Sequence, residues 1–161
     1  MTATRIDYFD DPGAPAATSM VPSVNVIVAD DDGRILLIRR TDNGNWAVPG
    51  GAIDLGESMI GAAVRETREE SGVDCEITGL LGIFTDPRHL IHYTSNDEVR
   101  QEFSIVLIGR AVGGEPTTSS ESSEVHWTDP ALLPELQMDR SMRMRLAHYE
   151  HYLATGQQHL G

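Results

Sequence analysis

The pattern of apolar positions begins with two short runs, residues 24–29 and 35–40, that are rich in Val, Ile and Leu. Runs of this length and composition, bounded by turn residues, are typical of β-strands. The segment between them, Asp-Asp-Asp-Gly at 30–33, has the composition of a turn. We therefore expect the two runs to pair as a hairpin.

Farther along, the periodicity changes to that of helices and then returns to that of strands. A helical pattern begins near Glu57 and runs to about Ser71, where Gly72 is a suitable C-terminal stop. Apolar residues at three- and four-residue spacing predict a second helix over residues 138–153. Strands with helices between and after them indicate a mixed α/β domain. The other expected strands are residues 75–84, 98–112 and 125–127, and residues 113–123 are expected as a connecting loop.

The length of the chain, 161 residues, is that of one ordinary domain. Residues 1–22 are punctuated by Pro and Gly, and we expect them to form a loosely ordered N-terminal arm. The single domain is expected over residues 23–156, with residues 157–161 as a C-terminal tail.

Composition limits the choice of partners. The formal net charge of −13 repels nucleic acids and anionic membranes, so neither is expected to bind. The apolar runs are too short to cross a bilayer, and the N-terminus shows no signal-peptide pattern. Cys75 is the single cysteine and cannot form an internal disulfide, which favours a reducing cytoplasm. A soluble, cytoplasmic protein is expected.

The first predicted helix carries a cluster of carboxylates. On a helical wheel Glu66, Glu69 and Glu70 share one side, because their spacing is i, i+3 and i+4. Clustered oxygen donors suit Mg²⁺ or Mn²⁺. The alternative is a solvated acidic face in which Arg65 pairs with Glu69. The residues expected to pack inward are Ile60, Ala63, Val64, Thr67 and Ser71.

Residues 51–73 resemble the signature box of the Nudix hydrolases. Every polar position of that pattern is present at its spacing: Gly51, Glu57, Arg65, Glu66, Glu69, Glu70 and Gly72. Thr67 departs from it, because the family usually has an aliphatic residue there. The segments 45–51 and 124–136 also resemble the family, and the resemblance implies its α/β/α sandwich with a mixed sheet.

The resemblance implies a role for each box residue. Glu69 and Glu70 correspond to the family's metal ligands, Glu66 to a further ligand or the holder of a metal-bound water, and the carbonyl of Gly50 often joins the metal shell. The cofactor implied is Mg²⁺ or Mn²⁺. Physically, a glycine lets the chain bend closely around a metal.

Three further positions complete the expected site without contacting the metal. Gly51 opens the box, and Glu57 and Arg65 resemble the ion pair that braces the loop against the helix.

A general base is needed to activate the attacking water, and its identity is left open. Glu70 or Glu66 could serve from the helix. Glu102 and Glu124 are candidates from outside it, although each is more readily interpreted as a structural or solvent-facing residue. His89 and His92 lack a second ligand pair for zinc, so we expect them to be surface or partly packed residues.

The resemblance implies hydrolysis of a pyrophosphate bond in a small-molecule nucleotide. Pro87, about fifteen residues after Gly72, resembles the ADP-ribose pyrophosphatase branch, so ADP-ribose or a related nucleoside diphosphate sugar is the leading substrate. Arg88 and Arg100 are candidate phosphate or ribose contacts. The alternatives are a nucleoside triphosphate pyrophosphohydrolase and a Nudix-like binding domain without hydrolysis. Many relatives are dimers, which is the only ground for expecting a homodimer.

Overall fold

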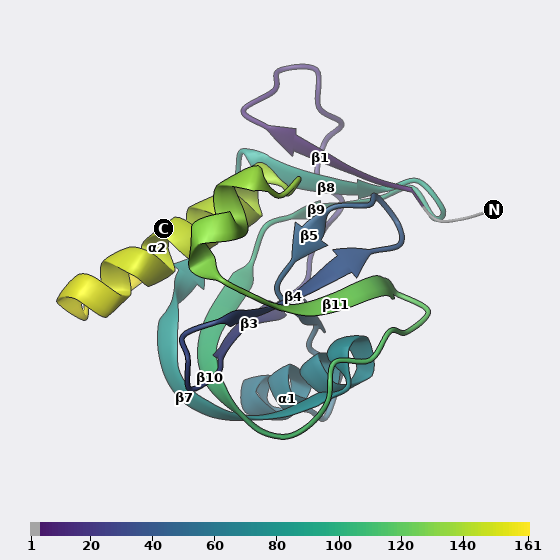
Figure 1. Ribbon diagram of the computed structural model, residues 1–161. Coiled ribbons are helices and arrows are strands. Elements are labelled where there is room, and N and C mark those ends of the chain that lie inside the picture. The colour runs from purple at the N-terminus through teal and green to yellow at the C-terminus, as the bar shows by residue number, and fades with distance from the viewer. Residues whose placement is uncertain (1–3) are drawn as a thin grey trace.

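The computed structural model describes residues 4–161 as a mixed α/β fold in which two helices lie on opposite sides of the larger of two sheets (Figure 1). The elements are β1 (Arg5–Phe9), β2 (Ser19–Met20), β3 (Ser23–Ala29), β4 (Ile35–Arg40), β5 (Trp46–Ala47), β6 (Gly50–Ala52), α1 (Met59–Ser71), β7 (Val73–Phe84), β8 (His89–Tyr93), β9 (Glu98–Gln101), β10 (Ser104–Gly114), β11 (Ser122–Thr128), the 3₁₀ helix η1 (Pro130–Glu135), α2 (Arg140–Thr155) and β12 (His159–Leu160).

The larger sheet has eight strands and forms the centre of the molecule. Its order is β11-β4-β3-β10-β7-β12, with β5 paired to β4 and β6 paired to β3. β10 runs parallel to β3, whereas β4 pairs with β3 antiparallel, as the expected hairpin requires. Val26, Ile27 and Val28 are all fully buried, because helices and loops cover both faces of this sheet. Burial on both faces explains the unbroken apolar run of β3.

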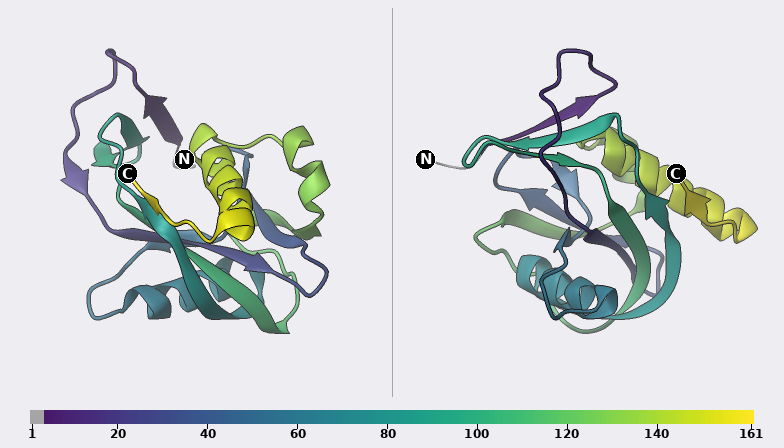
Figure 2. Two further views of the ribbon diagram at one scale, coloured as in Figure 1. Left: turned by 90° about the vertical axis from the view of Figure 1, so that its left-hand side faces the viewer. Right: turned by 180° about the vertical axis from the view of Figure 1, so that it is seen from behind.

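A second, four-stranded sheet has the order β1-β8-β9-β2 and lies at one end of the molecule (Figure 2). β1 pairs with β8 antiparallel along its whole length, from Arg5 opposite Tyr93 to Phe9 opposite His89. The expectation of a loosely ordered arm is therefore wrong for this segment; residues 1–3 of that arm lie outside the described part of the chain. The partner strand is distant in sequence, so the local pattern gave no sign of it.

The strand predicted over residues 98–112 is broken at Glu102 and Phe103. β9 belongs to the smaller sheet and β10 to the larger one, so the chain changes sheet at this point. Strands that switch between two sheets do so through a bend of this kind. The bend directs Glu102 into the interior.

The helices agree with prediction apart from their ends. α1 begins at Met59, two residues after the expected start, because Ser58 is its N-cap and accepts a hydrogen bond from the amide of Gly61. It ends at Ser71, and Gly72 adopts the left-handed conformation that closes the last turn. Within residues 4–161 no helix has the length and apolar character needed to span a membrane.

The expected C-terminal tail is also ordered. β12 pairs in parallel with β7, from His159 opposite Gly82 to Leu160 opposite Ile83. The division of the chain into an arm, one domain and a tail stays a prediction.

Candidate active site

The face that α1 turns to the sheet overlaps the predicted one, since Ala63, Thr67 and Ser71 are buried as expected. Ala62, Ala63, Thr67, Glu70 and Ser71 are its buried residues, whereas Ile60 is 49% exposed. The buried face is therefore rotated from the expected one toward the glutamates. The two alanines allow close approach to the sheet, and the burial of Glu70 is possible because a backbone amide of β6 faces it.

Glu70 is a buried carboxylate with little compensation. Only 4% of the residue is exposed, and its Oε1 accepts a hydrogen bond of 2.8 Å from the amide of Gly50. In residues 4–161 no arginine or histidine forms an ion pair with it. Burial raises its pKa to about 8, and the nearby charge of Glu66 acts in the same direction. Buried charges in proteins are normally paired or coordinate a metal.

Arg65, on the polar face of α1, contacts three carboxylates. It donates to Glu57 at 2.5 and 2.9 Å, to Glu66 at 2.9 Å and to Glu69 at 3.2 Å. Hydrogen bonding from Arg65 lowers the pKa of Glu57 to about 2. The structure therefore contains both the ion pair expected between the loop and the helix and the Arg65–Glu69 pair of the alternative interpretation. Removal of Arg65 would leave these three carboxylates without their cationic partner.

Gly51 allows Glu66 to approach the backbone. A Cβ atom at position 51 would lie 2.5 Å from Oε1 of Glu66, closer than real contacts allow. Burial raises the pKa of Glu66, whereas its hydrogen bond from Arg65 acts in the opposite direction. Position 51 therefore requires glycine for a steric reason, because the side chain of Glu66, a candidate metal ligand, occupies the space that a Cβ atom would need.

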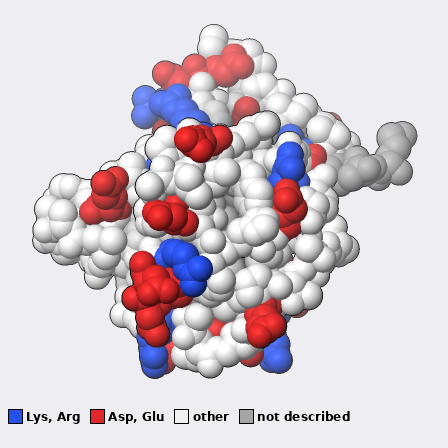
Figure 3. Space-filling model, in the orientation of Figure 1, with Lys and Arg blue, Asp and Glu red and all other residues white. Residues whose placement is uncertain are grey.

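The three glutamates line one cavity of about 410 Å³. Its size is within the range of small-molecule sites. Although the surface in Figure 3 carries many separate acidic patches, arginines are concentrated in this cavity. Of the 12 basic residues in the chain, five line it: Arg5, Arg40, Arg65, Arg100 and Arg145. A cavity with carboxylates and guanidinium groups on its walls suits a cation together with a phosphorylated ligand.

The donor set fits a divalent cation that completes its shell with ligand oxygens. Among residues 4–161 no three acidic, histidine or cysteine side chains are close enough together to form a complete metal site. Mg²⁺, however, normally takes one or two carboxylates and fills its other positions with water and substrate phosphate. The buried carboxylate of Glu70, compensated by one backbone amide and by no ion pair within residues 4–161, is the structural observation that calls for such a cation.

Of the two arginines predicted to contact the substrate, one lines the cavity and the other does not. Arg100 lines the cavity and is paired with Glu98 at 2.7 Å. Arg88 is outside it, on the surface, and pairs with Asp86 at 3.1 Å. Its use as a substrate contact is therefore not supported by its position.

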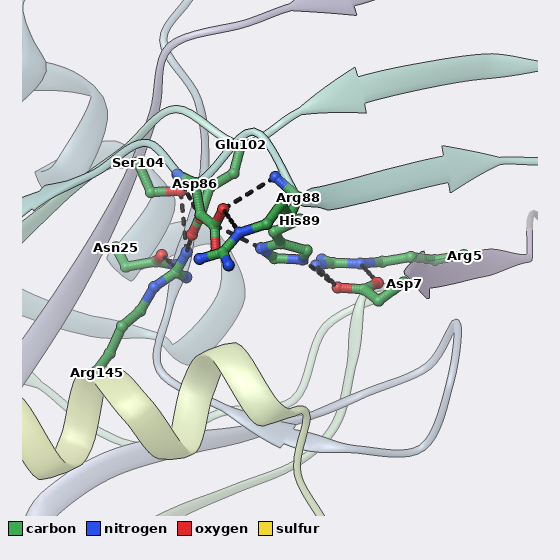
Figure 4. Close-up of polar contacts among 9 residues, drawn as sticks. All are labelled: Arg5, Asp7, Asn25, Asp86, Arg88, His89, Glu102, Ser104 and Arg145. Atoms are coloured by element: carbon green, nitrogen blue, oxygen red, sulfur yellow. Dashed lines mark hydrogen bonds and ion pairs between the residues drawn. The ribbon is translucent and has the colours of Figure 1, made fainter. Parts of the chain in front are cut away.

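The two candidate bases from outside the helix also lie outside this cavity. Glu102 is 1% exposed and pairs with Arg145 at 2.7 Å (Figure 4). Glu124 lies on β11, partly exposed, and pairs with Arg39 at 3.0 Å. Neither is among the residues that line the cavity, which leaves Glu66 and Glu70 as the better-placed candidates.

Sequence reasoning missed several residues of the cavity wall. Arg40, at the end of an apolar strand and next to a loop, carried a usable signal. Arg5 and Arg145 are 140 positions apart and have no common local pattern. Two acidic residues of the wall, Glu121 and Asp139, were missed as well.

Comparison with known proteins identifies the family. The NUDIX domain matches residues 20–149, so the chain belongs to the Nudix family. It is 36% identical over 108 residues to a "MutT-like protein" of Streptomyces ambofaciens, which covers 67% of this chain and 63% of that protein. It is 34% identical over 115 residues to an "ADP-ribose pyrophosphatase" of Methanocaldococcus jannaschii, which covers 70% of this chain and 64% of that protein. The chain thus spans slightly less than two thirds of the length of these relatives.

Solved structures confirm the α/β Nudix fold with its mixed sheet. A Nudix hydrolase from Nitrosomonas europaea superposes with a TM-score of 0.71 at 22% identity, covering 91% of this chain and 80% of that one. At this identity the likeness concerns the fold alone.

Proposed function

We propose that this chain hydrolyses a pyrophosphate bond in a nucleoside diphosphate linked to another moiety, with Mg²⁺ or Mn²⁺ as the cofactor. The observation that carries the proposal is the buried carboxylate of Glu70, which forms no ion pair within residues 4–161 although arginines line the same cavity. Glu66, Glu69 and Glu70, with the backbone of Gly50, would hold the cation. Family membership supports the same chemistry.

A divalent cation held by these residues would supply neutralisation of phosphate charge and activation of the attacking water. The chain's own residues supply orientation and proton transfer. Glu66 and Glu70 line the cavity, so either carboxylate, in its ionised form, is placed to accept a proton from the attacking water. Arg65 holds Glu66 and Glu69 in place through an ion pair with each of them.

ADP-ribose is the leading substrate. Support comes from the relative named "ADP-ribose pyrophosphatase" and from Arg100 on the cavity wall. A nucleoside triphosphate is the second candidate, favoured by the number of arginines that line the cavity, since each added phosphate brings more charge to neutralise. A binding domain without hydrolysis is less well supported, because all the box carboxylates are present.

The test is a screen of nucleoside diphosphate sugars and nucleoside triphosphates with Mg²⁺, with mass detection of the products. ADP-ribose should yield AMP and ribose 5-phosphate, whereas a triphosphate should yield a nucleoside monophosphate and pyrophosphate. We expect EDTA to abolish turnover and added Mg²⁺ or Mn²⁺ to restore it. Turnover that persists in chelator would contradict the metal assignment, and the absence of any turnover would favour the binding domain.

A further inference from the structure

Five side chains form a continuous chain of opposite charges through the interior (Figure 4). Arg5 donates to Asp7 through Nε at 2.7 Å and through Nη2 at 2.9 Å. Oδ2 of Asp7 lies 2.9 Å from Nε2 of His89. Nδ1 of His89 lies 3.4 Å from Oε2 of Glu102, and Oε1 of that carboxylate accepts from Nη2 of Arg145 at 2.7 Å. We call these five residues the charge chain.

The charge chain joins four separate parts of the fold. Arg5 and Asp7 belong to β1, His89 begins β8, Glu102 lies between β9 and β10, and Arg145 is on α2. Four of the side chains are buried, with exposed fractions of 1% for Glu102, 3% for His89 and 7% for Asp7 and Arg145, and Arg5 is 14% exposed. A buried ion pair is weak evidence for stability, since apolar residues of equal size often serve as well. The charge chain therefore calls for another explanation.

Both ends of the charge chain line the cavity that holds the glutamates. Arg5 and Arg145 are wall residues, whereas Asp7, His89 and Glu102 lie behind them. A guanidinium group has five N–H donors, so each arginine keeps some for a ligand. Among residues 4–161, Nη1 of Arg5 has no hydrogen-bond partner, and both of its other nitrogens donate to Asp7.

Arg145 is held more tightly but also keeps a free donor. Its Nη1 donates to Asn25, and its Nη2 donates to Ser104 at 3.1 Å as well as to Glu102. Its Nε is buried and has no partner among residues 4–161. A buried donor without a partner is costly, unless a ligand supplies the acceptor.

The charges of the chain leave room for an anion. The charge chain contains three basic side chains, Arg5, His89 and Arg145, and two carboxylates. Burial alone would lower the pKa of His89, but its hydrogen bond to Asp7 and the carboxylate of Glu102, 3.4 Å from Nδ1, hold the pKa above the ordinary value. With His89 protonated the charge chain has an excess positive charge, which an anionic ligand at the cavity wall would balance.

We propose that Arg5 and Arg145 form an anion subsite that binds a phosphate group of the nucleotide substrate without the help of the metal. Asp7, His89 and Glu102 are positioning residues that hold the two guanidinium groups from behind. The proposal rests on the proposed function only in taking a nucleotide as the ligand. It adds a second contact for phosphate, remote in sequence from the glutamates of α1.

The test measures binding of AMP and of adenosine by calorimetry in EDTA, so that neither metal nor hydrolysis contributes. The ratio of the two affinities isolates the phosphate. In the wild type AMP should bind at least tenfold more tightly than adenosine, and Arg5→Gln should lower that ratio at least fivefold. Arg110→Gln is the matched control, because Arg110 pairs with Glu76 at 2.6 Å on the exposed end of β10, outside the cavity. Its ratio should stay within twofold of the wild type.

His89→Gln tests the positioning role, since His89 does not line the cavity. The ratio should fall here as well, whereas a purely structural defect would weaken both ligands equally and leave the ratio unchanged. Arg145→Lys tests the Arg145 end of the charge chain in the same assay. If Arg145→Lys fails to fold, Arg5→Gln alone decides whether the subsite exists.

An unchanged ratio in Arg5→Gln, or AMP that binds only with added metal, would overturn the subsite. Either result would leave metal-dependent hydrolysis untouched, so failure of the subsite and failure of the proposed function can be told apart.

Discussion

At the scale of single residues, Glu70 has the most unusual surroundings in the site. It is a carboxylate among the buried residues of α1, and a backbone amide is its hydrogen-bond partner. A charge in this position is expensive in the metal-free protein and useful when a cation is bound. Its pKa of about 8 expresses that balance, because burial favours the protonated form.

Glu70→Gln and Glu69→Gln should each lower kcat at least about a hundredfold, equivalent to about 2.7 kcal/mol of transition-state stabilisation. Glutamine retains the size of the side chain but binds a hard cation poorly. Glu150→Gln, at an exposed position of α2, is the control and should retain full activity. Glu70→Gln should not lower the melting temperature of the metal-free protein, since a neutral amide is easier to bury. Near-normal turnover in both site variants would refute their assignment as ligands.

The residue types of the box could be assigned from the sequence, because each lies at a fixed distance from the others along one loop and one helix. The contact between Glu57 and Arg65 was predicted for that reason, and the structure contains it. The burial of Glu70 could not be predicted. It depends on the amide of Gly50, which β6 brings to the helix from outside the local periodicity.

At the scale of secondary-structure elements, the ends of α1 are set by two residues that the sequence displays. Gly72 closes the helix at a φ of 76°, which side chains rarely adopt. A Cβ atom there would also lie 2.6 Å from the carbonyl oxygen of Glu115. Gly72 is thus needed both to end the helix and to let the loop after β10 pass close to the backbone.

Gly72→Ala should lower the free energy of unfolding by at least about 1 kcal/mol, through backbone strain and the clash with Glu115. Gly44→Ala is a matched control, because Gly44 has a φ of 73° but nothing within 4 Å of the added Cβ. The difference between the two variants in urea unfolding measures the clash alone. Equal losses in both would show that the loop moves away without cost.

Elements with a strong local pattern were found from the sequence, and those that depend on distant partners were not. β3, β4 and both helices have apolar periodicity of their own. β1 and β8 are short, and each becomes a strand by pairing with the other across 80 to 88 positions. The bend at Glu102 could not be predicted for the same reason. It connects two sheets, and the division into two sheets is set by the whole fold rather than by the local sequence.

At the scale of the whole molecule, the charge chain connects the N-terminal strand to the C-terminal helix and makes stability depend on pH. The folded protein holds the pKa of His89 above its ordinary value of 6.5. A group with a raised pKa contributes stability that is complete below its unfolded value and is lost as the pH rises through its folded value.

The free energy of unfolding of the wild type should therefore exceed that of His89→Gln by more at pH 6 than at pH 9. Chemical unfolding of both proteins at the two pH values checks this, and the subtraction removes the other titrating groups. His151→Gln is the control, since His151 is exposed on α2 and hydrogen-bonds locally to Gln157. A difference that is the same at both pH values would mean that folding does not raise the pKa of His89.

The most direct test of the metal site is the binding of Mn²⁺ to the wild type, Glu70→Gln and Glu150→Gln, followed by calorimetry at neutral pH. If the buried carboxylate holds the cation, the wild type and Glu150→Gln will bind Mn²⁺ with the same affinity, and Glu70→Gln will bind it at least tenfold more weakly. Equal affinity in all three proteins would show that the cation is held elsewhere and would contradict the proposed site.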